Sequence, residues 1–172
     1  MQILGTLIQY LSGMASAKDS EAVRNAVGPL TDRFSSCSLN SAGLAIKAGG
    51  GVLAKIGSAD FYAVANGVPV KIAASTDMPA LTGMTIAANT FNWVSFFVDA
   101  AGTVTAALGT QGATLGASRP PQMPTRKALI GSLLITHSST FTGNTTPLDT
   151  ATTVYINGST AGAFDPSALL GF

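Results

Sequence analysis

Residues 91–108 form the longest stretch of the chain in which apolar positions follow a strand pattern. In residues 91–98 apolar side chains occur on both alternating sides of the predicted strand, whereas residues 103–108 alternate small and medium side chains. A strand that is apolar on both sides is central in a two-layer core or meets another chain. Asp99 and Gly102 have the residue types that favour the ends of a tight turn, so the stretch is predicted to be a hairpin.

A second apolar strand is predicted at residues 128–136, and we expect it to lie beside residues 91–98. One side of the hairpin should then fill a β-sandwich, and a second sheet or a neighbouring subunit should cover the other. We expect the only tryptophan to lie in the core. The side chains on which this prediction depends are Val94, Phe96 and Val98 on one side, Phe91, Trp93 and Phe97 on the other, and Leu129, Leu133 and Ile135 from the second strand.

Shorter strand signals occur on both sides of this centre. Residues 44–48 and 52–56 are predicted to pair across three glycines, and residues 61–65 and 68–73 across Asn66-Gly67, because both central residues of a type I′ turn need a positive φ. Pro69 cannot donate a backbone hydrogen bond and places its strand at an edge. Further short strands are expected at 84–88 and 154–156.

The two ends of the chain differ from this β pattern. Residues 1–36 are predicted to be an N-terminal arm or helix, with the better helix signal at 16–27, which packs on its own domain or reaches another subunit. Residues 37–172 are predicted to form the β domain, with a C-terminal tail at 159–172 whose apolar end should dock on a protein surface. The fold class expected is mainly β: an antiparallel β-sandwich or barrel-like domain with a short N-terminal helical or extended arm.

The long connection at residues 109–127 contains Gly109, Gly112 and Gly116 and then three prolines in the segment 119–124. Prolines stiffen an extended segment without forming a ladder. A connection of this length inside a domain is usually functional or packs on something. The two interpretations that remain are a surface crossover between sheets and a binding loop.

Charge is scarce in this chain. Only 10% of residues are charged and 47% are hydrophobic, with a formal net charge of +1; an ordinary globular protein carries about 25% charged residues. Subunit contacts and a surface rich in Ser and Thr would both suit such a composition. The densest cationic group, Arg119, Arg126 and Lys127, is too small to predict nucleic-acid binding.

No constellation of catalytic, metal-binding or cofactor-binding residues is found, so we predict a non-enzyme with no cofactor and no small-molecule substrate. Cys37 is the only cysteine and His137 the only histidine, which leaves no disulfide and no Cys–His cluster. The carboxylates are expected to bond to their own backbone in turns: Asp60, Asp77, Asp99, Asp149 and Asp165. No apolar run reaches the length of a membrane-spanning helix, so no membrane association is expected.

Several segments together resemble a known class of proteins. These are residues 43–50, 61–67, 76–81 and 97–105, followed by Pro147-Leu148-Asp149 and by 162–166. In order and pattern they are similar to small virion structural proteins of tailed bacteriophages, over roughly residues 40 to 166. The resemblance implies a head decoration, or cement, protein that is β-rich and commonly trimeric, and that sits on the outer capsid surface.

The function expected on this basis is that of a structural virion protein. It would bind the outer capsid surface as an oligomer, as a homotrimer on the major capsid protein, and stabilise the head after being made in the host bacterial cytoplasm. Burial of surface across several capsid subunits, multiplied by oligomeric attachment, would supply the stabilisation. The alternative is a tail-fibre or baseplate module that binds host-surface glycans, for which an exposed Trp93 beside an Asp or Asn would be the sign.

Overall fold

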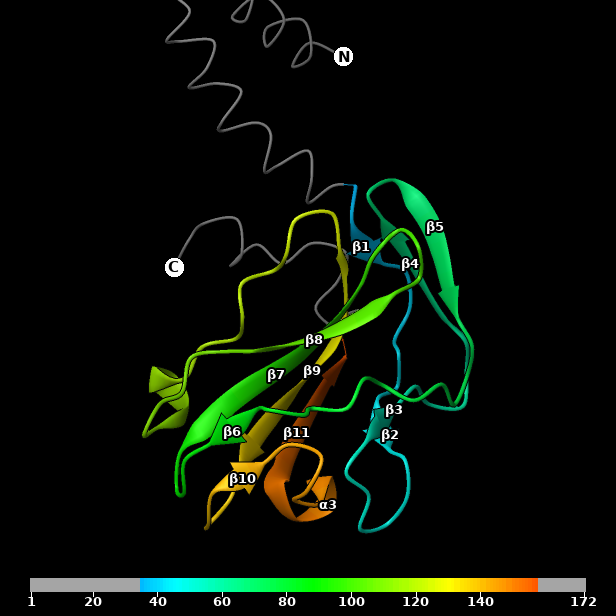
Figure 1. Ribbon diagram of the computed structural model, residues 1–172. Helices are drawn as coiled ribbons and strands as arrows, with labels where there is room; N and C mark the ends of the chain where they lie inside the picture. The colour runs from blue at the N-terminus through cyan, green and yellow to red at the C-terminus, as the bar shows by residue number, and fades with distance from the viewer. Residues whose placement is uncertain (1–34, 158–172) are drawn as a thin grey trace, which may run out of the picture.

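The computed structural model describes residues 35–157, which form a mainly β fold of several antiparallel sheets (Figure 1). The sheets are not closed into a barrel, so the mainly β, antiparallel prediction is confirmed and its barrel-like version is not. The strands are β1 (Cys37–Ser38), β2 (Ala45–Ile46), β3 (Ala54–Lys55), β4 (Phe61–Ala65), β5 (Val68–Ile72), β6 (Thr85–Ile86), β7 (Phe91–Val98), β8 (Val104–Leu108), β9 (Ala128–Thr136), β10 (Phe141–Thr142) and β11 (Thr152–Asn157).

Two short helices complete the elements of the described residues, a 3-10 turn η1 (Leu115–Ala117) and α3 (Leu148–Ala151). The predicted arm at 1–36 lies outside the described residues except for its last two positions. The predicted tail at 159–172, with Asp165, lies wholly outside them.

The largest sheet has the strand order β11-β9-β7-β8. Strands β7 and β8 form the predicted hairpin, in which Val98 pairs with Val104 and Val94 with Leu108. The other side of β7 pairs with β9, as expected for the two most apolar strands of the chain. The observed bounds of β9 are those predicted from the sequence, residues 128–136.

A bulge interrupts the pairing of β7 with β9. Phe96 lies opposite Gly131 but Phe97 lies opposite Leu129, so Ile130 is an extra residue in β9. An extra residue reverses the alternation of sides along the bulged strand. Ile130 is therefore buried in the main core together with Leu133, whereas Leu129 is only half-buried and lies opposite Phe97. The prediction that Leu129 shares a side with Leu133 was wrong for this reason.

A smaller sheet has the order β1-β4-β5. Its β4–β5 hairpin turns at Asn66 and Gly67, whose φ angles of 52° and 77° confirm the predicted turn. Contacts of β1 and β4 with β9 place this sheet over part of the large one, as Figure 1 shows with β4 and β5 beside the far end of β7 and β8. The two remaining pairs, β2 with β3 and β6 with β10, are ribbons of two residues per strand.

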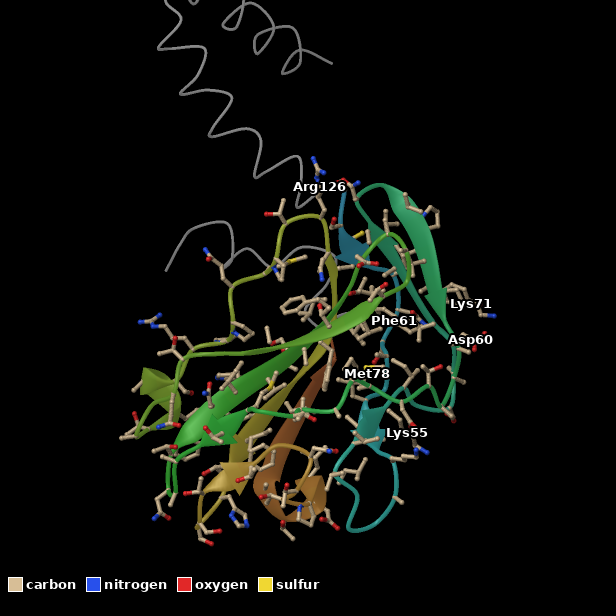
Figure 2. The ribbon with its side chains drawn as sticks, viewed as in Figure 1. Lys55, Asp60, Phe61, Lys71, Met78 and Arg126 are labelled. Carbon is tan, nitrogen blue, oxygen red and sulfur yellow. The ribbon has the colours of Figure 1, made fainter. Side chains whose placement is uncertain are left out.

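The main core lies between these sheets and ribbons. Phe61 from the small sheet and Met78 from the following loop point inward in Figure 2, and both are at most 2% exposed. From the large sheet, one side of β7 contributes Val94, Phe96 and Val98, as predicted. Strands β1 and β10 and helix α3 were not predicted, because two- to four-residue elements leave no periodic pattern in the sequence.

Candidate functional site

The side of the large sheet that turns away from the main core carries the most unusual residues of the chain. We call this side, with Trp93 and Phe97 of β7 and Leu129 and Leu134 of β9, the outer face. Phe97 is 2% exposed and Leu134 is 4% exposed, yet neither belongs to the main core cluster. Trp93 is only half-buried. The prediction that Trp93 lies in the core was wrong, because its position in the alternation places it on this second, thinner layer.

Two polar contacts lie within the outer face. The hydroxyls of Ser95 and Ser132, on paired positions of β7 and β9, are 2.7 Å apart and buried. Lys127 Nζ donates a 3.0 Å hydrogen bond to Thr105 Oγ1 of β8, which joins the end of the 109–127 connection to the sheet. Both contacts are neutral or singly charged and have a full partner, as groups in a partly dry environment require.

The 109–127 connection is anchored at its start rather than free along its length. Gly112 and Phe91 exchange backbone hydrogen bonds of 2.9 and 3.0 Å, and Thr110 and Arg119 exchange bonds of 2.9 and 3.0 Å. Gly109 has no room for a side chain, since a Cβ there would lie 2.2 Å from the carbonyl oxygen of Arg119. These bonds extend the hairpin beyond β8 and agree with a surface crossover, the first of the two interpretations of this segment.

The cationic residues near this connection do not form a compact patch with one role. Arg119 and Arg126 are exposed, and Arg126 lies at the tip of the connection before β9 (Figure 2). Lys127 is half-buried, with its ammonium group bonded to Thr105. Arg126 has a φ of 62°, so the chain turns at this residue before entering β9.

The carboxylates hold turns and ends of strands together. Asp99 Oδ1 accepts from the backbone N–H groups of Ala101 and Thr103 at 3.0 Å, as predicted for a turn carboxylate. Asp149, by contrast, accepts from the N–H of Gly50 at 2.7 Å, a residue 99 positions away, and so joins α3 to the glycine turn of β2–β3. For Asp149 the prediction of a bond within its own turn was therefore wrong.

Two carboxylates form ion pairs. Asp77 pairs with Lys47 at 2.5 Å and Asp60 with Lys71 at 2.7 Å. Figure 2 shows Asp60 and Lys71 close together beside the small sheet. The hydrogen bond from Lys71, and then that from the N–H of Ala74, hold the pKa of Asp60 below its ordinary value, while Asp60 raises the pKa of Lys71. Both pairs are largely in water, where such contacts contribute little to stability.

His137 and Cys37 have local surroundings. His137 Nδ1 lies 2.9 Å from Ser139 Oγ and accepts from the N–H of Ser139 at 3.2 Å, which closes the turn after β9. Cys37 is a free, half-buried thiol in β1, in agreement with the interpretation of a small packing residue. Within residues 35–157, no group of three His, Cys, Asp or Glu side chains is placed to hold a metal ion.

The small sheet exposes two large apolar side chains next to each other. Leu39 follows β1 and is 59% exposed, and Tyr62 of β4 is 43% exposed; the N–H of Leu39 donates to the carbonyl oxygen of Tyr62 at 2.9 Å. Lys71 lies 5.8 Å from the centre of the Tyr62 ring. We call Leu39 and Tyr62 the Leu39–Tyr62 patch. No signal in the sequence identified it, because β1 was not predicted.

None of the helices in the part of the chain that the structure describes is both long enough and apolar enough to span a membrane. Comparison of the chain with protein families, with curated proteins and with solved structures finds no match.

Proposed function

We propose that this protein is a structural component of a tailed-bacteriophage head, which binds the outer capsid surface as an oligomer and stabilises the head. The observation that carries the proposal is how the described charged and reactive groups are used. Asp99, Asp149 and His137 each hold a turn or a pair of segments together, and Asp60 and Asp77 pair with neighbouring lysines. A fold that uses these groups for its own architecture suits a structural role better than a chemical one.

The composition supports the same proposal. With 10% charged residues, the chain has few long charged side chains to keep its copies and partners apart. A cement protein acts by burying surface across neighbouring capsid subunits, and an oligomer raises its avidity without new contacts. We propose a homotrimer, in line with the phage decoration proteins that the chain resembles.

The Leu39–Tyr62 patch is our candidate for the capsid contact. Exposed apolar side chains that adjoin each other mark interaction sites more often than single ones do. Tyr62 has an apolar ring and a polar tip, the combination that is enriched at interfaces. Leu39→Asp should weaken binding to expanded heads, while Leu115→Asp, at another residue that is 50% exposed, serves as the matched control.

The deciding experiment compares heads assembled with and without this protein. Heads that lack it should assemble but lose integrity at a lower temperature or under chelation, and adding back the purified protein should restore resistance. Equal robustness of the two kinds of head would contradict the proposal and indicate a display or adhesion role.

The alternative, a tail-fibre or baseplate module that binds glycans, is favoured by one observation. Trp93 is half-buried rather than fully buried, so part of its ring is available for stacking on a sugar. Its neighbour Asn92 does not assist, because that side chain is 2% exposed and its Oδ1 accepts from the N–H of Trp93. Glycan binding that Trp93→Ala abolishes, with no binding to heads, would replace our proposal by this one.

A further inference from the structure

The outer edge of β8 carries backbone groups without a strand partner. Strand β8 lies at one edge of the large sheet, and between residues 35 and 157 no strand pairs with its free side (Figure 1). The N–H of Asp99 donates to Thr103 and that of Gly109 to Trp93, which fixes the phase of the β7–β8 ladder. Because backbone groups alternate in direction along a strand, Val104, Ala106 and Leu108 direct their N–H and C=O groups outward. No hydrogen bond from the described residues reaches these groups.

The edge also lacks the usual protection against pairing with another chain. Edge strands are normally blunted by charges, proline, bulges or a covering segment. Strand β8 has the sequence Val-Thr-Ala-Ala-Leu, and its register with β7 is unbroken. The edge strand of the small sheet is different, because β5 carries Pro69 and Lys71. The chain therefore protects one sheet edge with proline and charge and leaves the other open.

The open edge is complementary to itself. From these backbone positions we infer that β8 pairs in antiparallel fashion with β8 of a second copy of this chain, about a two-fold axis at Ala106. Ala106 then faces Ala106 of the partner subunit, and Val104 faces Leu108 of the partner subunit. Each of the three outward residues exchanges its N–H and C=O with its opposite residue, so that the two large sheets become continuous.

The side chains around this axis suit the pairing. On the core side, Val104, Ala106 and Leu108 are half-buried and pack against the main core, so the partner's equivalent residues would cover their remaining apolar surface. On the outer face, Thr105 would lie opposite the small Ala107 of the partner subunit. The ammonium group of Lys127 is already bonded to Thr105, and β8 itself is uncharged, so the two strands meet without like charges in the ladder.

A two-fold contact of this kind makes a prediction about stoichiometry. It uses the same surface on both copies, so by itself it closes at two chains. If other contacts form a three-fold ring, as proposed above, the β8 edge joins two such rings. In both cases the assembly contains an even number of chains. This inference does not depend on the capsid role, because it concerns the purified protein alone.

The first test measures the mass of the full chain by analytical ultracentrifugation over a wide range of protein concentration. The wild type should form an even-numbered assembly, and Ala106→Pro should halve its mass, because proline removes the outward N–H without breaking a bond to β7. Ala106→Val keeps the N–H and should keep the wild-type mass. A monomer at all concentrations, an odd number of chains, or an unchanged mass for folded Ala106→Pro would overturn the inference.

A second test does not depend on the folding of the proline variant. The axis at Ala106 places two copies of residue 106 in a hydrogen-bonded pair, with Cα atoms about 5.5 Å apart, within the range of a disulfide. In a Cys37→Ser background, Ala106→Cys should form a covalent dimer on mild oxidation. Ala107→Cys, one residue along, should cross-link much less, because residue 107 faces residue 105 of the partner subunit.

Equal cross-linking of the two cysteine variants, or of neither, would overturn the two-fold register. Hydrogen exchange separates self-pairing from capture of a foreign strand. The amides of Val104, Ala106 and Leu108 should exchange slowly in the purified protein and at the wild-type rate when heads are added. Protection that appears only with heads would overturn self-pairing and identify a strand of the capsid as the occupant of the edge.

Discussion

The hydroxyls of Ser95 and Ser132 meet at 2.7 Å across the β7–β9 pair, with Ser95 1% and Ser132 8% exposed. They lie on the outer face, between the positions of Phe97 and Trp93 along β7. Each hydroxyl is the partner of the other in a layer that is buried but separate from the main core. The pair therefore gives a direct measure of how dry this layer is.

A double-mutant cycle on this pair tests the layer. Ser95→Ala should lower the free energy of unfolding by about 1–3 kcal/mol, because it leaves the Ser132 hydroxyl buried without its partner. The double variant with Ser132→Ala should cost less than the sum of the two single changes, since two methyl groups leave no unpaired polar group. Chemical denaturation measures all four proteins. Strictly additive costs would mean that water reaches the pair.

Phe96 and Trp93 should differ strongly in their cost of truncation. Phe96 is fully buried in the main core, and Phe96→Ala should destabilise the protein by about 3–5 kcal/mol. Trp93→Ala removes a larger side chain but one that is half-buried, and its cost should be smaller. Thermal and urea unfolding give the comparison. An equal or larger loss for Trp93→Ala would mean that a further segment or subunit covers the indole.

Gly143 should tolerate no side chain. A Cβ at this position would lie 1.9 Å from the carbonyl oxygen of Leu81 and 2.7 Å from its carbonyl carbon, both rigid backbone atoms. Gly143→Ala should therefore push β10 away from the β6 loop and cost at least about 1–3 kcal/mol. Gly116→Ala is the matched control, because nothing lies within 4 Å of a Cβ there and its φ is not positive. The two unfolding midpoints should be clearly separated.

The Asp60–Lys71 pair should contribute to stability across a wide but limited pH window. The pKa of Asp60 is lowered below 3.8 by the hydrogen bond from Lys71 and then by that from Ala74, so its contribution is present above 3.8 and is lost as pH falls through the folded value. The pKa of Lys71 is raised above 10.5 by Asp60, so its contribution is present below 10.5 and is lost as pH rises through the folded value.

Melting temperatures measured from acid to alkaline pH check this prediction. Asp60→Asn should remove part of the fall at low pH, and Lys71→Met part of the fall at high pH. Near neutral pH both changes should be small, because the side chains are 32% and 56% exposed and salt screens the pair. Identical acid profiles for the wild type and Asp60→Asn would show that Asp60 has no part in the pH dependence.

Elements set by local chemistry could be predicted from the sequence. The Asn66-Gly67 turn needs two positive φ angles, which few other residue pairs supply, and the structure has both. Strand β9 was predicted with its observed bounds because a long apolar run is a strong signal. Asp99 was placed in its turn for a similar reason, since it bonds within five residues.

Elements set by distant partners could not be predicted. Strand β1 exists because Cys37 and Ser38 meet β4, and the bond from Gly50 to Asp149 joins residues 99 positions apart. The bulge at Ile130 depends on how β9 meets β7, and the sequence of β9 alone contains no sign of it. The Leu39–Tyr62 patch was missed with β1. The open edge of β8 became visible only once the strand order was known.

The bulge at Ile130 also bears on which changes of chain length this protein can accommodate. Removing Ile130 would bring Leu129 into the phase of Leu133 and turn apolar side chains of β9 from one layer to the other. Removing one residue from the exposed stretch 138–140 would change no strand phase. A library of single-residue deletions should therefore show a sharp minimum of folded protein within β9 and a broad tolerance just after it, so that the length of this strand is inherited more strictly than the identity of its side chains.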